Sequence, residues 1–170
     1  RNSQRLSLLN EFVTAFPIVN IPNLTLDTYS LGRGSQDSFC YWLEKKLGTL
    51  GRFSPGLAGT TVYGVYFSQE QNDFVSTDNT PQQKLDGIKS ALNTLLTTQN
   101  YTAAAAIFRK SFILKILSSY FPNEYFPIFS QNHLKLIAKI FEINTTGLDD
   151  IQLNKKINEK FFEMKANHSS

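Results

Sequence analysis

Apolar side chains recur at intervals of three or four residues along most of the chain, the spacing typical of amphipathic helices. In residues 5–16 the apolar positions share one helical face, and Pro17 ends the segment. Ser35 is suited to cap the next helix, and Pro81 to occupy the first position of another. The spacing predicts helices over 5–16, 36–47, 102–120 and 148–164. It also predicts a helix that begins at Thr80–Pro81 and another that is capped by Ser130.

A second pattern predicts a small amount of sheet. Residues 61–67 are rich in β-branched and aromatic side chains, which indicates a strand. A turn at Asn72–Asp73 would allow residues 73–77 to pair with it. The remaining stretches with proline or glycine predict extended links or turns over 17–26, 27–34 and 125–129. We therefore expect a helix-rich α+β protein with a small antiparallel sheet or partial barrel.

Length and composition suit one folded domain. The chain has 170 residues, of which 41% are hydrophobic and 13% aromatic, enough to build a packed interior. There is no internal repeat and no composition typical of a linker. We therefore expect a single domain over 1–170, with its core at about 5–143 and a lysine-rich C-terminal helix at about 148–165.

Charge and cysteine content narrow the class of protein. The formal net charge is +3, which permits a nucleic-acid partner without requiring one. Cys40 is the only cysteine, so an internal disulfide framework is excluded and a reducing, cytoplasmic location is expected. No apolar run reaches the roughly 20 residues that span a bilayer, so we expect no membrane partner. Because the sequence starts at Arg1, we expect an excised domain.

Catalytic chemistry finds little support in the sequence. There is no P-loop pattern, so we expect no nucleotide hydrolysis by this chain. Cys40 lies between two aromatic residues on a predicted helix, which is typical of a buried structural thiol. Glu44 and Lys46 resemble part of a metal-nuclease triplet, but side chains two residues apart diverge on a helix. We expect no catalytic residue, no metal site and no cofactor.

The segment around Arg52 is better suited to contact with a nucleic acid than to catalysis. Residues 51–60 are rich in glycine, which exposes backbone amides that can approach a phosphate closely. The neighbouring candidate contacts are Lys45, Lys46, Tyr63 and Tyr66. Cations suit phosphates and aromatic rings suit bases. The alternative is that the glycines only make a tight helix-to-strand connection and that the tyrosines pack in the core.

Aromatic residues beside these cations are candidates for a pocket around an extruded base. The candidate lining residues are Tyr41, Trp42 and Phe53. Aromatic residues at helical spacing belong to the core more often than to a pocket, so packing is the alternative role. The lysines of the last predicted helix offer an accessory phosphate contact or, alternatively, a solvated helix face.

Two blocks of the sequence resemble a known family. The first contains LTLDTY (24–29), DSFCYWLE (37–44), Leu47–Gly48, a glycine-rich loop and YGVY (63–66). The second contains KILSSYFP (115–122), FPIFS (126–130) and His133–Leu134. In this order, over about residues 9–143, they are similar to the N-terminal domain of bacterial McrB-type AAA+ restriction proteins, including relatives of the LlaJI type. Phe53 and Pro55 stand where that family often has glycine.

The resemblance implies a non-catalytic DNA-recognition domain that selects a modified cytosine or a particular sequence, by base flipping or by major-groove readout. The partners it implies are double-stranded DNA, a C-terminal AAA+ motor and a separate nuclease subunit. On this hypothesis the DNA contacts are Arg33, Lys45, Lys46, Arg52, Tyr63 and Tyr66. The alternative is a protein-interaction module that docks a partner subunit or a phage component. An exposed apolar patch would favour that alternative, and a concave basic face would favour DNA.

Overall fold

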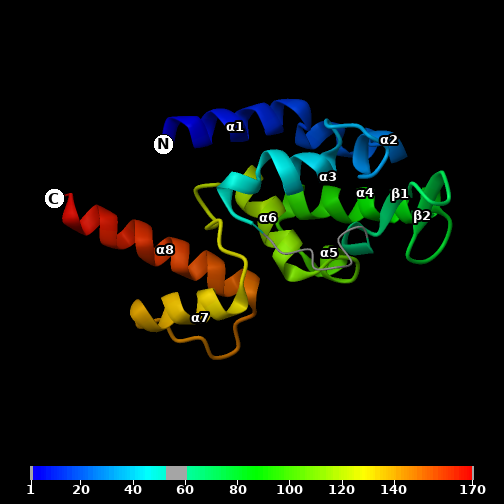
Figure 1. The fold of residues 1–170 in the computed structure, drawn as a ribbon. Coiled ribbons are helices and arrows are strands. Elements are labelled where there is room, and N and C mark those ends of the chain that lie inside the picture. Colours follow the sequence, from blue (N-terminus) through cyan, green and yellow to red (C-terminus); the bar gives the residue numbers. More distant parts are fainter. Residues whose placement is uncertain (1, 53–60, 170) are drawn as a thin grey trace.

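The computed structural model describes residues 2–52 and 61–169. Helices dominate the fold and two short strands form one antiparallel hairpin, which confirms the expected helix-rich α+β class (Figure 1). The helices and strands are α1 (Asn2–Ala15), α2 (Leu26–Tyr29), α3 (Phe39–Tyr41), β1 (Val65–Ser68), β2 (Asp73–Ser76), α4 (Pro81–Thr98), α5 (Thr102–Ala105), α6 (Lys110–Tyr120), α7 (Gln131–Ile140) and α8 (Asp150–His168). Short 3₁₀ or π-helical turns lie at η1 (Ile18–Asn23), η2 (Trp42–Lys46), η3 (Gly48–Leu50) and η4 (Thr61–Tyr63).

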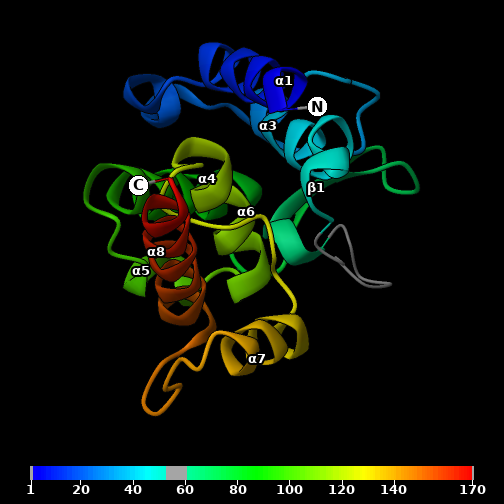
Figure 2. The same ribbon diagram turned by 90° about the vertical axis from the view of Figure 1, so that its left-hand side faces the viewer.

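Helix α6 lies at the centre of the core. Its residues are apolar nearly all round, and every side chain from 112 to 119 is buried, as expected of a helix that crosses a core. Helices α1, α5 and α8 pack against it (Figures 1 and 2). Phe12 of α1 is fully buried, and its ring lies within 6.0 Å of the rings of Phe16, Phe39, Trp42 and Tyr120. An aromatic cluster therefore joins α1 to α3 and α6.

The starts of the two longest helices follow from local sequence. At α4, the Thr80 hydroxyl accepts a hydrogen bond from the Gln83 amide and the Gln83 side chain accepts one from the Thr80 amide. Pro81 occupies the first turn, as predicted. Asp149 and Gln152 form the same reciprocal cap at the start of α8.

The helix predicted over 36–47 differs from the observed one at both ends. It begins only at Phe39, because Ser38 rather than Ser35 is the cap: Oγ of Ser38 accepts a hydrogen bond from N of Tyr41 at 3.2 Å. After one α-helical turn the chain changes to the π-helical turn η2. The prediction therefore gave the right element with the wrong start and the wrong helical type.

Proline and tertiary packing explain two further differences. Residues 17–26 were predicted to be extended, but they hold the 3₁₀ turn η1, whose preceding residue Pro17 has a φ of −62°. The helix predicted over 102–120 is interrupted between α5 and α6, where Arg109 is extended. Alanine favours a continuous helix there, but α5 packs against α4 while α6 crosses the core, so packing overrides local propensity.

The hairpin is shorter than predicted at its start. Gly64 has a φ of +80°, and the residues before it form the turn η4 instead of extending the strand predicted over 61–67. Strands β1 and β2 then pair with Phe67 opposite Phe74. Sequence predicted the second strand correctly, because the turn at Asn72–Asp73 fixes where the chain reverses.

Two asparagines fasten α8 to the segment that precedes α7. Oδ1 of Asn154 accepts a hydrogen bond from N of Phe126 at 2.8 Å. Its Nδ2 donates to O of Phe126 at 2.9 Å and to O of Ile128 at 2.8 Å. Nδ2 of Asn158 donates to O of Asn123 at 2.7 Å. Beyond Asn158 no described residue of α8 is buried, and this end of the helix projects from the body (Figure 1).

Candidate nucleic-acid interface

The exposed turn at residues 32–34 lies along the edge of the hairpin. N of Phe67 donates a hydrogen bond to O of Leu31 at 2.8 Å, and the Gln69 side-chain amide donates to O of Gly32. Gly32 has a φ of +106°, and a Cβ atom there would clash with O of Phe67. Only glycine permits this close approach, which places the next residue, Arg33, over the hairpin.

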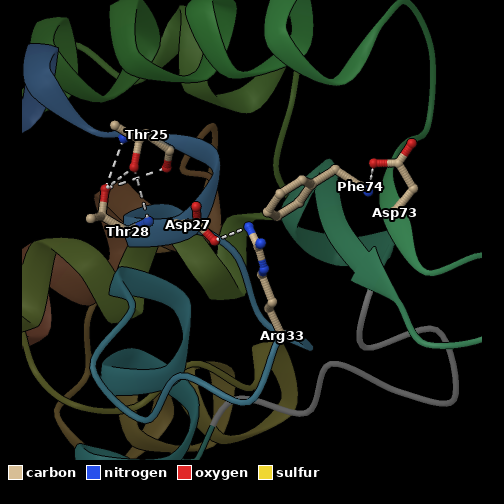
Figure 3. A network of polar contacts seen from close by, with 6 residues as sticks. All are labelled: Thr25, Asp27, Thr28, Arg33, Asp73 and Phe74. Atoms are coloured by element: carbon tan, nitrogen blue, oxygen red, sulfur yellow. Dashed lines mark hydrogen bonds and ion pairs between the residues drawn. The ribbon is translucent and has the colours of Figure 1, made fainter.

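Arg33 lies between Asp27 of helix α2 and Phe74 of the hairpin (Figure 3). Its guanidinium carbon is 5.6 Å from the centroid of each ring, Phe67 and Phe74, and these rings are 5.2 Å apart. Nη1 of Arg33 also donates to Oδ1 of Asp27 at 2.6 Å. The Arg33 side chain is 53% exposed, so a cation held against aromatic rings is accessible to a phosphate or a base edge.

The π-helical turn η2 carries the two predicted lysines. N of Leu47 donates to O of Trp42 at 2.8 Å, a bond that spans five residues, and such turns often occur at functional sites. Nζ of Lys45 lies 2.7 Å from Oε1 of Glu44. Nζ of Lys46 lies 2.6 Å from Oδ1 of Asp37, which follows the Arg33 turn in the chain. Lys46 thus pairs with the segment that follows Arg33, whereas Lys45 pairs with a residue of its own turn.

Two predicted contact residues lie in the core instead of on the surface. Tyr63 is fully buried, and its hydroxyl donates to Oε2 of Glu44 at 2.6 Å. Burial and this hydrogen bond raise the pKa of Tyr63 well above its usual value. Trp42 is 7% exposed, and Nζ of Lys46 lies 4.2 Å from the centre of its ring. Neither ring is accessible to a base in this structure, so the packing alternative applies to both.

The other predicted residues are distributed differently. Tyr41 and Tyr66 are half-buried, and Tyr66 lies on the face of the hairpin opposite to Phe67. Phe53 lies outside the described residues. Arg52 is exposed and, within residues 2–52 and 61–169, has no carboxylate partner. Arg52 is therefore the predicted cation that is readiest to bind a phosphate.

A buried lysine fixes the backbone just before Arg52. Nζ of Lys115 on α6 donates to O of Leu47 at 2.5 Å and to O of Gly51 at 2.6 Å. Burial lowers the pKa of Lys115 to about 8, because no carboxylate in the described part of the chain offsets its desolvation. Gly51 has a φ of +119°, and a Cβ atom there would stand 2.7 Å from O of Pro127. The start of the glycine-rich segment is thus held against the core.

We expect Lys115 to make stability depend on pH. The unfolded chain keeps this lysine protonated up to a pKa of about 10.4, whereas the folded chain releases the proton near pH 8. Between these values the unfolded state binds more protons, so the folded state gains stability as pH rises. Relative to Lys115→Met, the native chain should gain about 1 kcal/mol in the free energy of unfolding between pH 8 and 9.

Urea denaturation at several pH values measures this difference, and subtracting the variant removes the contribution of the tyrosines that both proteins share. The exposed Lys156→Met serves as the matched control and should follow the native curve. Parallel pH curves for the native chain and Lys115→Met would contradict the expected shift.

The sequence reading missed the aromatic pair and the carboxylates of this surface. Phe67 and Phe74 were not predicted as site residues, although the turn at Asn72–Asp73 sets the register that places them opposite each other. The glycines on both sides of Arg33 were a second signal, because they indicate close backbone approach. No sequence pattern indicated that Asp27 would pair with Arg33.

Three of the four predicted cations are paired with carboxylates. Arg33 pairs with Asp27, Lys45 with Glu44 and Lys46 with Asp37. Exposed ion pairs are worth only about 0–1 kcal/mol, so an incoming phosphate can displace a carboxylate at low cost. In the part of the chain that is described, no three His, Cys, Asp or Glu side chains cluster as a metal site. No helix in that part has the length and apolar character needed to cross a membrane.

Comparison of the chain with protein-family models, with curated proteins and with solved structures finds no match. The likeness to McrB-type restriction proteins therefore rests on the sequence motifs. Of these motifs, the block over 37–44 leads into the π-helical turn, and the block over 63–66 leads into strand β1.

Proposed function

We propose that this chain is a non-catalytic DNA-binding domain of a bacterial restriction system, which selects the DNA on which a C-terminal AAA+ motor and a separate nuclease subunit act. The observation that carries the proposal is the exposed Arg33, held beside Phe67 and Phe74 at the edge of the hairpin. The likeness of the motif blocks to McrB-type proteins supports it. The π-helical turn with Lys45 and Lys46 adds two cations near the same loop.

The proposed DNA contacts are of two kinds, one to a base and the others to phosphates. A planar guanidinium can bond to two acceptors of guanine in the major groove, so Arg33 is the proposed base-reading residue. The ammonium groups of Lys45 and Lys46 and the guanidinium of Arg52 are proposed to contact phosphates, which position the protein without reading sequence. Binding is then expected to weaken with salt, because each neutralised phosphate releases counterions.

Alanine at Arg33 or Arg52 should weaken binding in distinct ways. Arg33→Ala is expected to reduce affinity for the preferred duplex about tenfold and to reduce discrimination between duplexes, because a base contact is worth about 1–3 kcal/mol. Arg52→Ala is expected to reduce affinity severalfold for every duplex and to lower the salt dependence by about one phosphate contact. Fluorescence-anisotropy titrations at two salt concentrations measure both effects.

The matched control is Lys135→Ala on α7, away from the hairpin (Figure 1). Lys135 is exposed and has no ion pair with any residue that the structure describes. Its affinity should equal that of the native chain. Equal binding by all three variants, or no binding of the native chain to any duplex, would refute the proposed interface.

The duplex panel should contain unmodified cytosine, 5-methylcytosine, 5-hydroxymethylcytosine and N6-methyladenine. Preference for one modified duplex that persists at the higher salt supports recognition of a modified base. Equal binding across the panel directs the search to a particular sequence, by selection from random DNA. Incubation of the same duplexes with magnesium or manganese tests the non-catalytic part of the proposal, which cleavage by the pure chain would overturn.

A further inference from the structure

Exposed apolar side chains gather on the last two helices. Of the seven large apolar side chains that are exposed in the described part of the chain, five belong to α7 or α8: Leu136, Ile140, Phe161, Phe162 and Met164. This end of the molecule lies away from the hairpin (Figure 1). A concentration of this kind is typical of a surface that another polypeptide covers.

The exposed side chains of α8 continue its buried face. Ile151, Asn154, Ile157 and Asn158 are buried, and they share one side of the helix. At 100° per residue, Phe161, Met164, Lys165 and His168 lie on that same side, beyond the point where the body of the protein ends. We call these four residues the α8 stripe. The end of α8 that carries the stripe projects from the body of the protein in Figure 1.

A hollow accompanies the α8 stripe. It has a volume of about 500 Å³ and is lined by Phe141, Ser169 and all four residues of the stripe. Phe161 is anchored at its inner end, where its ring lies 5.2 Å from the ring of Phe126. The spacing of the stripe, i, i+3, i+4 and i+7, is the spacing that packs against another helix.

The charges around the stripe indicate what kind of helix fits. Lys165 and His168 line the hollow and have no acidic partner among residues 2–52 and 61–169. The carboxylates of Glu159 and Glu163 lie on the other side of α8 by helical geometry. A second copy packed across the stripe about a two-fold axis would bring the Lys165 ammonium groups toward each other, which disfavours self-association.

We infer that the α8 stripe docks an acidic amphipathic helix of a partner polypeptide, with apolar side chains on Phe161 and Met164 and carboxylates on Lys165 and His168. This inference does not depend on DNA binding, because the stripe and the hairpin lie at different ends of the molecule (Figure 1). The helix-in-groove mode supplies affinity from the apolar side chains and selectivity from the charges.

The test uses the whole chain and two designed helical peptides that share the same leucine spacing. One carries glutamate and the other lysine at its polar positions, and each is labelled for fluorescence anisotropy. We expect the glutamate peptide to bind at least tenfold more tightly than the lysine peptide. Replacement of Lys165 and His168 together by glutamate should reverse this preference, since the stripe then carries acidic side chains while its apolar residues remain.

Two further variants make the test specific. Met164→Asp should lower the affinity for the glutamate peptide at least fivefold, because it places a charge in the apolar part of the stripe. Lys156→Glu makes the same charge change as Lys165→Glu on an exposed position off the stripe, and it should leave binding within twofold of the native value. Circular-dichroism melts of all variants establish that they are folded.

Three results would overturn the inference. Equal binding of the glutamate and lysine peptides would show that charge does not select the partner. A loss of binding in Lys156→Glu as large as in the stripe variants would show that the peptide does not bind at the stripe. A concentration-dependent dimer in light scattering that Met164→Asp abolishes would assign the surface to a second copy. None of these results bears on duplex binding, so the two proposals fail separately.

Discussion

Phe12→Ala is expected to lower the free energy of unfolding by about 3–5 kcal/mol, the range for a fully buried phenylalanine. The side chain is fully buried, and its ring contacts four other aromatic rings. Removing it leaves a cavity between α1, α3 and α6 that the surrounding rings are too rigid to fill, in addition to the lost burial of apolar surface. Urea denaturation followed by circular dichroism measures the change.

Phe12→Leu is the companion variant, because it keeps most of the apolar volume and should cost clearly less than the alanine substitution. It also keeps the prediction testable if Phe12→Ala is too unstable to fold. Equal stability of Phe12→Ala and the native chain would show that the aromatic cluster is not packed around this ring.

Asn154→Ala is expected to destabilise the chain by about 3 kcal/mol or more, although it removes only a small polar side chain. Three hydrogen bonds are lost at once, and the N and O of Phe126 and the O of Ile128 lose their partner inside the protein. These bonds are partly buried, and a hydrogen bond within a protein is worth about 1 kcal/mol, so the loss of three amounts to about 3 kcal/mol. The expected loss is concentrated where α8 joins the segment before α7, so hydrogen exchange should rise there first.

Asn158→Ala provides the comparison for this effect. Asn158 is also buried on α8 but makes one hydrogen bond to the backbone, to O of Asn123. Its loss should cost about 1 kcal/mol, close to the value of a single hydrogen bond. If the two alanine variants had the same stability, the three bonds of Asn154 would not be the link between these segments.

The sequence predicted those parts of the fold that depend on neighbouring residues. The start of α4 follows from Thr80, Gln83 and Pro81, which lie within four positions of one another. The reversal at Asn72–Asp73 likewise needs only adjacent residues, and it correctly predicted the second strand. Amphipathic spacing identified α1, α7 and α8 because each buries one face against the rest of the molecule.

The parts that the sequence could not predict depend on contacts between distant residues. Tyr63 was predicted on a strand as a candidate DNA contact, with packing in the core as the alternative. Its hydroxyl reaches Glu44, 19 positions earlier, and the ring is buried. Lys115 was read as part of an apolar helix, and only the fold brings its ammonium to the carbonyls of Leu47 and Gly51. Composition and spacing contain no signal for such pairings.

The candidate site was predicted in part. Arg33, Lys45 and Arg52 are exposed, and these are the positions where the sequence placed cations for DNA. The residues that hold Arg33 in place were missed, since Phe67 and Phe74 face it only after the hairpin has formed. Nearness in sequence to the cations does not distinguish surface aromatic residues from core residues such as Trp42.

Glu44 receives a hydrogen bond from the buried Tyr63 through one oxygen and an ion pair from the surface residue Lys45 through the other. A phosphate that draws Lys45 away therefore changes the charge balance at a carboxylate that also holds the core. Surface occupancy and interior packing are then thermodynamically coupled, and such coupling is reciprocal. Tyr63 would accordingly influence a ligand that it never touches, by setting the free energy with which Glu44 retains or releases Lys45.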